Sequence, residues 1–281
     1  LLINEHPNST YISKALLKRG LIYYNQKADD NALISFKKVV NDYPGTEEAK
    51  QALATIKKIY IDKGSIEQYE NYLAGVQNVD SAQMIMDKDY FEVAENSFMS
   101  GNCDKATADF TKYLEKYPNG TYKIQAHYYK AVCEQKAGFK NEALMDFEEV
   151  IKHPKNAFTE DALLNAAKLS KMLAQPEKAL NYFSKLEYLA DIQDNVFLAQ
   201  VEQMRLNFEL ENHDNTIKYC EMIINKDIDN KNLLAETHLI YGKTALKKDD
   251  YNKAFKEFST AAAASNKFGV EAKYNVANIL Y

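Results

Sequence analysis

The sequence predicts an all-α protein, a right-handed α-solenoid of antiparallel helix pairs with about seven repeats and partial helices at both ends. The main observation is an alanine followed four residues later by phenylalanine, at a period of 36 to 37 residues, as from Ala106 to Ala143 and from Ala143 to Ala179. Such a fixed period indicates a repeat architecture. The pairs are Ala32/Phe36, Ala106/Phe110, Ala143/Phe147, Ala179/Phe183 and Ala254/Phe258, with degenerate versions at Gln68/Tyr72 and Thr216/Cys220.

Glycines and prolines keep the same period. Gly64, Gly101 and Gly138 are 37 residues apart, and each lies between two helical patterns. A residue that tolerates positive φ makes a tight turn there at low cost. Prolines that follow histidine or tyrosine are predicted to separate one hairpin from the next. They are Pro7, Pro44, Pro118 and Pro154.

Between these marks, apolar residues recur with helical spacing, as in residues 16–24 and 32–40. Thr46 and Thr121 follow turns and are predicted helix N-caps. We expect the alanine to let the second helix approach the first, and the phenylalanine to fill the space beyond it on the same face. Because one hairpin cannot bury its apolar stripe alone, stability must come from stacking of neighbours.

We predict one continuous solenoid over residues 1–281. Residues 65–79 lack both the alanine–phenylalanine pair and a closing proline, so we expect any hinge there. Residues 2–7 resemble the end of a second helix and residues 271–281 an unpartnered first helix, which favours a fragment of a longer array or ends covered by a partner or a second copy. The predicted repeats are residues 10–45, 46–80, 81–118, 119–155, 156–192, 193–228 and 229–266, with 267–281 as the first helix of a further repeat.

Composition argues against several classes of function. Hydrophobic residues make up 46% of the chain, enough for a core, and no run of about 20 apolar residues predicts a membrane span. The formal net charge is -5, and Arg19 and Arg205 are the only arginines. Forked guanidinium contacts to phosphates and bases are therefore scarce, and nucleic acid is not an expected partner.

No catalytic, cofactor-binding or metal-binding residues are predicted. The odd number of cysteines, without C-x-x-C spacing, argues against a disulfide framework and a zinc site, so Cys103, Cys133 and Cys220 are expected to be buried apolar residues. The five histidines lack metal-ligand spacing, and no nucleotide-binding glycine motif is present. We predict that this segment is not an enzyme, and a catalytic part outside it remains an open alternative.

The pattern Gly20, Tyr23, Ala32, Phe36 and Pro44 resembles the tetratricopeptide repeat family, and the likeness covers nearly the whole chain. The period is longer than the common 34 residues of the family, and tryptophan is absent. The unit at residues 117–122 is similar to a bacterial cell-envelope branch that includes the Tol-Pal coordinator and the outer-membrane-assembly lipoprotein. That likeness suggests a periplasmic or outer-membrane-associated protein, with a cytoplasmic location still open.

The resemblance implies a protein–protein interaction scaffold that binds a protein or peptide on a concave groove lined by the first helix of each repeat. The alternative is a structural spacer or self-assembly module of a larger multi-repeat bacterial envelope protein, associating through its exposed ends. Charges of both signs, including Lys14, Glu92, Glu95, Glu202 and Glu236, are expected on or near the groove. By position, the partner-binding candidates are Tyr24, Phe91, Phe98, Tyr128, Tyr129, Lys168, Lys171, Arg205, Phe208, Lys243 and Lys247.

Overall fold

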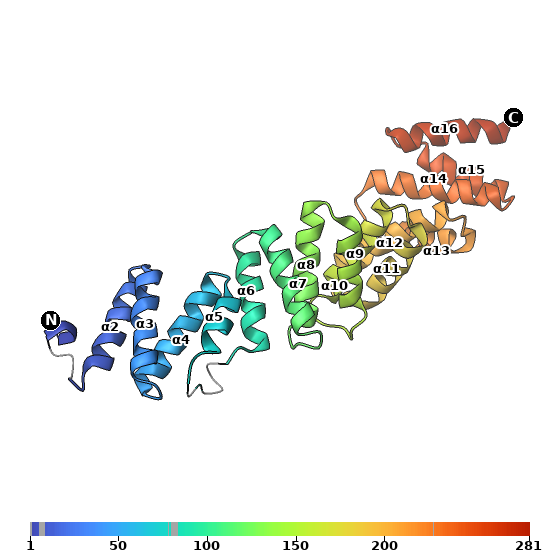
Figure 1. Ribbon diagram of the computed structural model, residues 1–281. Coiled ribbons are helices and arrows are strands. Elements are labelled where there is room, and N and C mark those ends of the chain that lie inside the picture. The colour runs from blue at the N-terminus through green and yellow to red at the C-terminus, as the bar shows by residue number, and fades with distance from the viewer. Residues whose placement is uncertain (1, 6–8, 78, 80–83, 227) are drawn as a thin grey trace. The chain divides into compact units, whose positions relative to one another are not determined.

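The computed structural model describes residues 2–5, 9–77, 79, 84–226 and 228–281, and all the regular structure in these ranges is helical (Figure 1). The chain divides into two compact units, residues 1–139 and 140–281. Within each unit, consecutive helices contact each other in turn. This confirms the predicted all-α fold of paired helices. None of the helices in the described ranges is long and apolar enough to cross a membrane.

In the first unit, α2/α3, α4/α5 and α6/α7 form hairpins, and α8 packs on α7. The first helices also contact one another in order, α2 on α4, α4 on α6 and α6 on α8, so they share one face of the unit. The short α5 lies within the stretch where the repeat pattern is weakest. The helix bounds are α1 Leu2–Glu5, α2 Ile12–Asn25, α3 Asp29–Asp42, α4 Glu47–Asp62, α5 Ile66–Leu73, α6 Asp87–Met99, α7 Cys103–Lys116 and α8 Lys123–Ala137.

In the second unit, α9 packs on α10, and α10/α11, α12/α13 and α14/α15 form hairpins. The last helix, α16, contacts both α15 and α14. The helix bounds are α9 Lys140–Ile151, α10 Thr159–Met172, α11 Pro176–Leu189, α12 Gln193–Glu209, α13 His213–Ile224, α14 Lys231–Lys247, α15 Tyr251–Ala261 and α16 Lys267–Leu280.

The repeated alanine–phenylalanine pairs form the core of the hairpins, as predicted. All five alanines and all five phenylalanines are at most 1% exposed. In the first hairpin, the ring of Phe36 packs directly on the backbone of Gly20 in the facing helix. The small residue that admits the ring is therefore on the first helix as well as on the second.

The turn inside each hairpin, and the turn that follows α8, contains one residue with a left-handed backbone conformation. Gly64, Gly101 and Gly138 adopt it with φ of 64°, 77° and 87°, which confirms their predicted role. At the equivalent positions of the other hairpins the residue is not glycine. These residues are Lys27, Ala174, Glu211 and Asp249, with φ of 60°, 54°, 56° and 59°.

The two predicted threonine caps have different outcomes. The hydroxyl of Thr46 accepts a hydrogen bond from the backbone N–H of Ala49 at 3.2 Å, so Thr46 caps α4 as predicted. The prediction for Thr121 is wrong, because α8 begins two residues later at Lys123. The backbone N–H of Thr121 instead donates to the Asp87 carboxylate at 2.6 Å, which ties the turn to the start of α6.

The expectation of three unpaired cysteines is also wrong. Cys103, the first residue of α7, forms a disulfide with Cys133 in α8, with a Cα–Cα distance of 5.0 Å. The two cysteines are 30 residues apart in sequence, and they meet because α7 and α8 pack side by side. Burial is as expected for Cys133 and Cys220, which are both 0% exposed, and Cys220 is a free thiol.

Candidate protein-binding face

The partner-binding candidates all lie on first helices of hairpins or on α8. In the first unit, Tyr24 is on α2, Phe91 and Phe98 are on α6, and Tyr128 and Tyr129 are on α8. In the second unit, α10, α12 and α14 carry the others, which are Lys168, Lys171, Arg205, Phe208, Lys243 and Lys247.

The first unit brings Phe98 and Tyr129 together as a stacked pair. Their ring centroids are 4.4 Å apart with an interplanar angle of 19°, and Tyr128 lies beside Tyr129 at 5.8 Å. Both members of the stack are half-buried, so part of each ring faces solvent. Tyr24 is half-buried on α2. This aromatic pair is a candidate contact for a partner.

Phe91 does not contribute to an exposed face. Its side chain is 3% exposed and stacks on Tyr122 at 4.5 Å between centroids. It also contacts the rings of Phe110 and Tyr113. Phe91 is therefore a core residue, and a position on a first helix does not by itself place a side chain on the surface.

An acidic group lies next to the aromatic pair. The amide nitrogen of Gln125 donates to the Glu95 carboxylate at 3.3 Å and to the Tyr129 hydroxyl at 3.1 Å. Burial, and then the charge of Glu92, raise the pKa of Glu95. The face formed by α6 and α8 therefore combines aromatic rings with a partly desolvated carboxyl group.

In the second unit, several of the basic candidates are already paired with acids on the same face. Arg205 makes a two-pronged contact with Glu236, from Nε to Oε1 at 2.8 Å and from Nη2 to Oε2 at 2.6 Å. Its Nη1 donates to Glu202 at 2.6 Å, and Lys171 pairs with the other oxygen of Glu202. Burial alone would raise the pKa of Glu202, but Lys171 and then Arg205 outweigh it and hold that pKa below its usual range.

The remaining basic candidates are less constrained. Lys243 pairs with Glu271 of α16 at 2.5 Å, and its ammonium lies 6.0 Å from the centre of the Phe208 ring. Lys168 and Lys247 are exposed on α10 and α14. Arg205, Lys171 and Lys243 are therefore paired with acids within the chain, whereas Lys168 and Lys247 face solvent.

A hollow of about 480 Å³ opens between α12, α14 and α16, next to Arg205. We call it the anchor hollow. Its lining combines five apolar side chains with Asp194, Arg205, Glu236 and two asparagines. The apolar side chains are Phe197, Leu198, Val201, Leu233 and Phe268.

Among the residues of the anchor hollow, the sequence predicts Arg205 as a partner-binding candidate and Glu236 as a charge on or near the groove. The sequence also indicates that Phe197 and Val201 lie beside Arg205. The three residues follow one another at intervals of four and so share one face of α12. The contribution of Phe268 carries no local signal. It depends on how α16 packs on α14.

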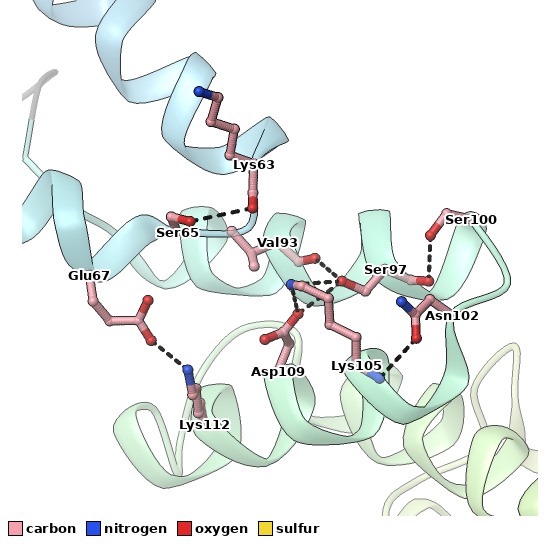
Figure 2. A network of polar contacts seen from close by, with 10 residues as sticks. All are labelled: Lys63, Ser65, Glu67, Val93, Ser97, Ser100, Asn102, Lys105, Asp109 and Lys112. Atoms are coloured by element: carbon pink, nitrogen blue, oxygen red, sulfur yellow. Dashed lines mark hydrogen bonds and ion pairs between the residues drawn. The ribbon is translucent and has the colours of Figure 1, made fainter. Parts of the chain in front are cut away.

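A second polar cluster joins the α4–α5 turn to α6 and α7 (Figure 2). The Lys105 ammonium donates to Asp109 at 2.6 Å and to the Ser97 hydroxyl at 3.3 Å, and Ser97 also donates to Asp109 at 2.8 Å. A serine next to a lysine can act as a nucleophile. Here the ammonium is paired with the Asp109 carboxylate and packs against the neighbouring turn.

The geometry of this cluster gives it a structural role. A Cβ atom on Gly64 would lie 2.4 Å from the Lys105 ammonium, so the lysine packs directly against the turn. The ion pair between Glu67 and Lys112, at 2.8 Å, joins α5 to α7 nearby. These contacts hold one hairpin against the next.

Comparisons with known proteins agree with this architecture. Residues 14–46, which include most of α2 and all of α3, match the tetratricopeptide repeat family. The solved structure of YrrB, described as a TPR protein with an unusual peptide-binding site, is 18% identical with a TM-score of 0.50, over 66% of this chain and 91% of that chain. No curated protein matches the sequence.

Two further solved structures show weaker likeness. The MamA protein is 16% identical with a TM-score of 0.45, over 68% of this chain and 94% of its own. A tetratricopeptide repeat protein from Parabacteroides merdae ATCC 43184 is 18% identical with a TM-score of 0.34, over 96% of this chain and 99% of its own. The likeness to YrrB, with the paired helices, shows the tetratricopeptide-repeat fold. The comparisons do not support the narrower likeness to the bacterial envelope branch.

Proposed function

We propose that this chain is a protein-binding scaffold that holds a segment of a partner in the anchor hollow. The observation that carries the proposal is an open hollow, lined by apolar and polar side chains, on the first helices of consecutive hairpins. Hollows of this size and character are typical of ligand sites, and a few apolar anchors commonly dominate the affinity of an interface. Tetratricopeptide repeats generally serve as protein-binding scaffolds, which supports the same function.

The charges around the hollow favour an apolar anchor over a terminal carboxylate. Glu236 and Glu202 already occupy both edges of the Arg205 guanidinium. A carboxylate of a partner would have to displace one of them, and a displaced Glu236 would lose its two-pronged ion pair with Arg205, which is costly. The proposed occupant is therefore a large apolar side chain from within a partner segment.

In the first unit, the stacked pair of Phe98 and Tyr129 is a proposed further contact, with Tyr24 and Tyr128 at its margin. Exposed aromatic rings are frequent hot spots because they bring large contact area at low entropic cost. Lys168 and Lys247 are proposed to contribute to binding at the solvent-exposed edge of the interface with the partner, where charges mainly affect the association rate. The buried Phe91 is left out of the proposal.

The experiment that tests the proposal selects binding peptides from a random displayed library on the full chain. Selected peptides are synthesised, and their affinities are measured for the wild type and for Leu198→Ala with Phe268→Ala. Both side chains are half-buried in the hollow, so their loss should weaken binding by about tenfold or more.

Ile34→Ala is the matched control, because Ile34 is a large apolar residue exposed on a second helix, α3. It should leave the affinity unchanged. Peptides that bind the hollow variant as tightly as the wild type, with no large apolar residue in common, would overturn the proposal.

A second candidate function, self-assembly, is favoured by the exposed apolar face of α16. Val270, Tyr274 and Leu280 are 67%, 67% and 70% exposed there. Association of two copies through this face would give a dimer whose population rises with concentration. Sedimentation of the wild type and of Val270→Lys with Tyr274→Lys tests it, and a wild type that stays monomeric at high concentration would exclude it.

A further inference from the structure

A trough of about 450 Å³ lies in the second unit between the second helices of two consecutive hairpins, α11 and α13. Its walls come from these two helices and its floor from α12. We call it the amide trough. It shares no lining residue with the anchor hollow. The residues that define it are Asn181, Ser184, Gln203, Asn207, Asn215 and Tyr219.

The floor of the amide trough is polar where a helical repeat ordinarily places apolar core residues. Gln203 and Asn207 line the floor and are 3% and 2% exposed. Gln200, which is 7% exposed and outside the lining, lies on the same face of α12. A buried amide is costly unless its polar atoms find partners. Apolar packing therefore does not account for this run of amides.

Hydrogen bonds fix the orientation of the floor amides. The Glu187 carboxylate accepts from Gln203 Nε2 at 2.6 Å and from Gln200 Nε2 at 2.9 Å. Gln203 Oε1 in turn accepts from the Tyr219 hydroxyl at 2.8 Å. Asn207 Nδ2 donates to the backbone carbonyl of Gln203 at 2.8 Å. The floor is thus set before any ligand arrives, which reduces the entropy lost on binding.

The walls add polar groups that face solvent. Asn181 and Ser184 are exposed on α11, and Asn215 is exposed on α13. The charged residues of the lining are one acid, Glu177, and one base, Lys218, so the trough has no strong preference for a charged ligand. Recognition there must come from neutral hydrogen bonds.

An asparagine side chain presents a carbonyl acceptor and an N–H donor in one plane. A peptide group presents the same pair of functions, so the two can hydrogen-bond to each other whatever the side chains of the peptide. We propose that the amide trough binds an extended polypeptide segment through its main-chain N–H and C=O groups.

The length of the trough fits such a segment. From Glu177 to Ser184 the wall on α11 extends about 10 Å, at about 1.5 Å per helical residue. An extended chain covers that distance with about three residues, at about 3.3 Å each. The trough would therefore hold a short stretch of main chain with little dependence on sequence.

The experiment uses the side-chain amide signals of the full chain in nitrogen–proton correlation spectra. The probe is a capped peptide of about seven glycine and serine residues, which lacks the large apolar side chain that the anchor hollow needs. The side-chain NH₂ signals of Asn181, Asn207 and Asn215 should shift on titration. A peptide of the same sequence with N-methylated main-chain nitrogens should bind about tenfold more weakly.

The variant that tests the walls is Asn181→Ala with Asn215→Ala, both exposed and so compatible with folding. It should weaken binding of the probe by about tenfold. Asn278→Ala, an exposed asparagine on α16, is the matched control and should leave binding unchanged.

Three results would overturn the proposal. The first is that the N-methylated peptide shifts the side-chain NH₂ signals as much as the probe does. The second is that the probe causes no shift at millimolar concentration. The third is that a neutral oligosaccharide shifts these signals and the probe does not. Binding of the probe that is lost in Leu198→Ala with Phe268→Ala, but kept in the asparagine variant, would also reject the amide trough. That result would leave the proposed function of the anchor hollow intact.

Discussion

The ring of Phe36 lies so close to the backbone of Gly20 that a Cβ atom on Gly20 would be 2.5 Å from the ring carbon Cε1. The same relationship joins Gly242 and Phe258, where the distance to Cδ1 is 2.6 Å. In both hairpins the second-helix aromatic ring fills space that a first-helix side chain would otherwise take. In the other three pairs the equivalent first-helix residue is a fully buried alanine, Ala94, Ala131 or Ala167, so the repeated pair depends on a small residue in the facing helix.

Gly20→Ala is expected to destabilise the protein. Alanine gains about 1 kcal/mol of helix propensity over glycine, but overpacking of a fully buried ring costs about 1–3 kcal/mol. A net loss of about 1 kcal/mol should appear in urea unfolding followed by circular dichroism. Phe36→Leu should cost less in the Gly20→Ala background than in the wild type, because the smaller side chain relieves the clash. A Gly20→Ala variant more stable than the wild type would contradict this account.

Ala174→Gly is expected to stabilise the protein. Ala174 has a left-handed backbone with φ of 54°, which costs a residue with a Cβ atom about 1 kcal/mol. Glycine removes most of that cost, so the free energy of unfolding should rise by about 0.5–1 kcal/mol. Gly138→Ala is the reciprocal variant, since a Cβ atom there would meet nothing within 4 Å and only the conformational cost remains. Changes of the same sign in both variants would refute the argument.

The repeat architecture could be predicted from the sequence because its strongest signals are structural necessities. Ala106 and Phe110 are both fully buried, and Gly138 does adopt positive φ. The turn at Glu211 has the same backbone conformation without glycine, so composition gave no sign of it. The pairing of Cys103 with Cys133 was missed because it depends on how α7 and α8 pack.

The candidate face was less predictable than the fold. A position on a first helix did not separate the buried Phe91 from the half-exposed Phe98, because neighbouring turns of α6 differ in how deeply they pack. The sequence identifies the basic candidates, but it does not show how they pair with acids. The two carboxylates that pair with Arg205, for example, come from different helices, α12 and α14. Which charges remain available to a partner is a tertiary property.

Reduction of the disulfide between Cys103 and Cys133 is expected to lower stability by about 2–4 kcal/mol, because the bond constrains the unfolded chain. The measurement is the denaturation midpoint with and without reductant, together with a count of free thiols. Cys103→Ser should lose the effect of the reductant. Cys220→Ala should keep it, since Cys220 forms no disulfide. A wild type that titrates three thiols without reductant would show that the bond does not form.

The stability of the second unit is expected to depend on the ionisation of Glu202. Its carboxylate pairs with Lys171 and Arg205, and its folded-state pKa lies below the ordinary value of 4.5. A carboxyl group whose pKa is depressed by folding contributes stability that is fully present above its unfolded-state pKa. This stability is lost as pH falls through its folded-state pKa. As pH falls below about 5, the thermal midpoint of the wild type should therefore fall more steeply than that of Glu202→Gln. Glu209→Gln, an exposed glutamate at the end of the same helix, should keep the steep wild-type profile. Parallel profiles for the wild type and Glu202→Gln would show that Glu202 makes no net ionic contribution, and that the neighbouring charges do not depend on it.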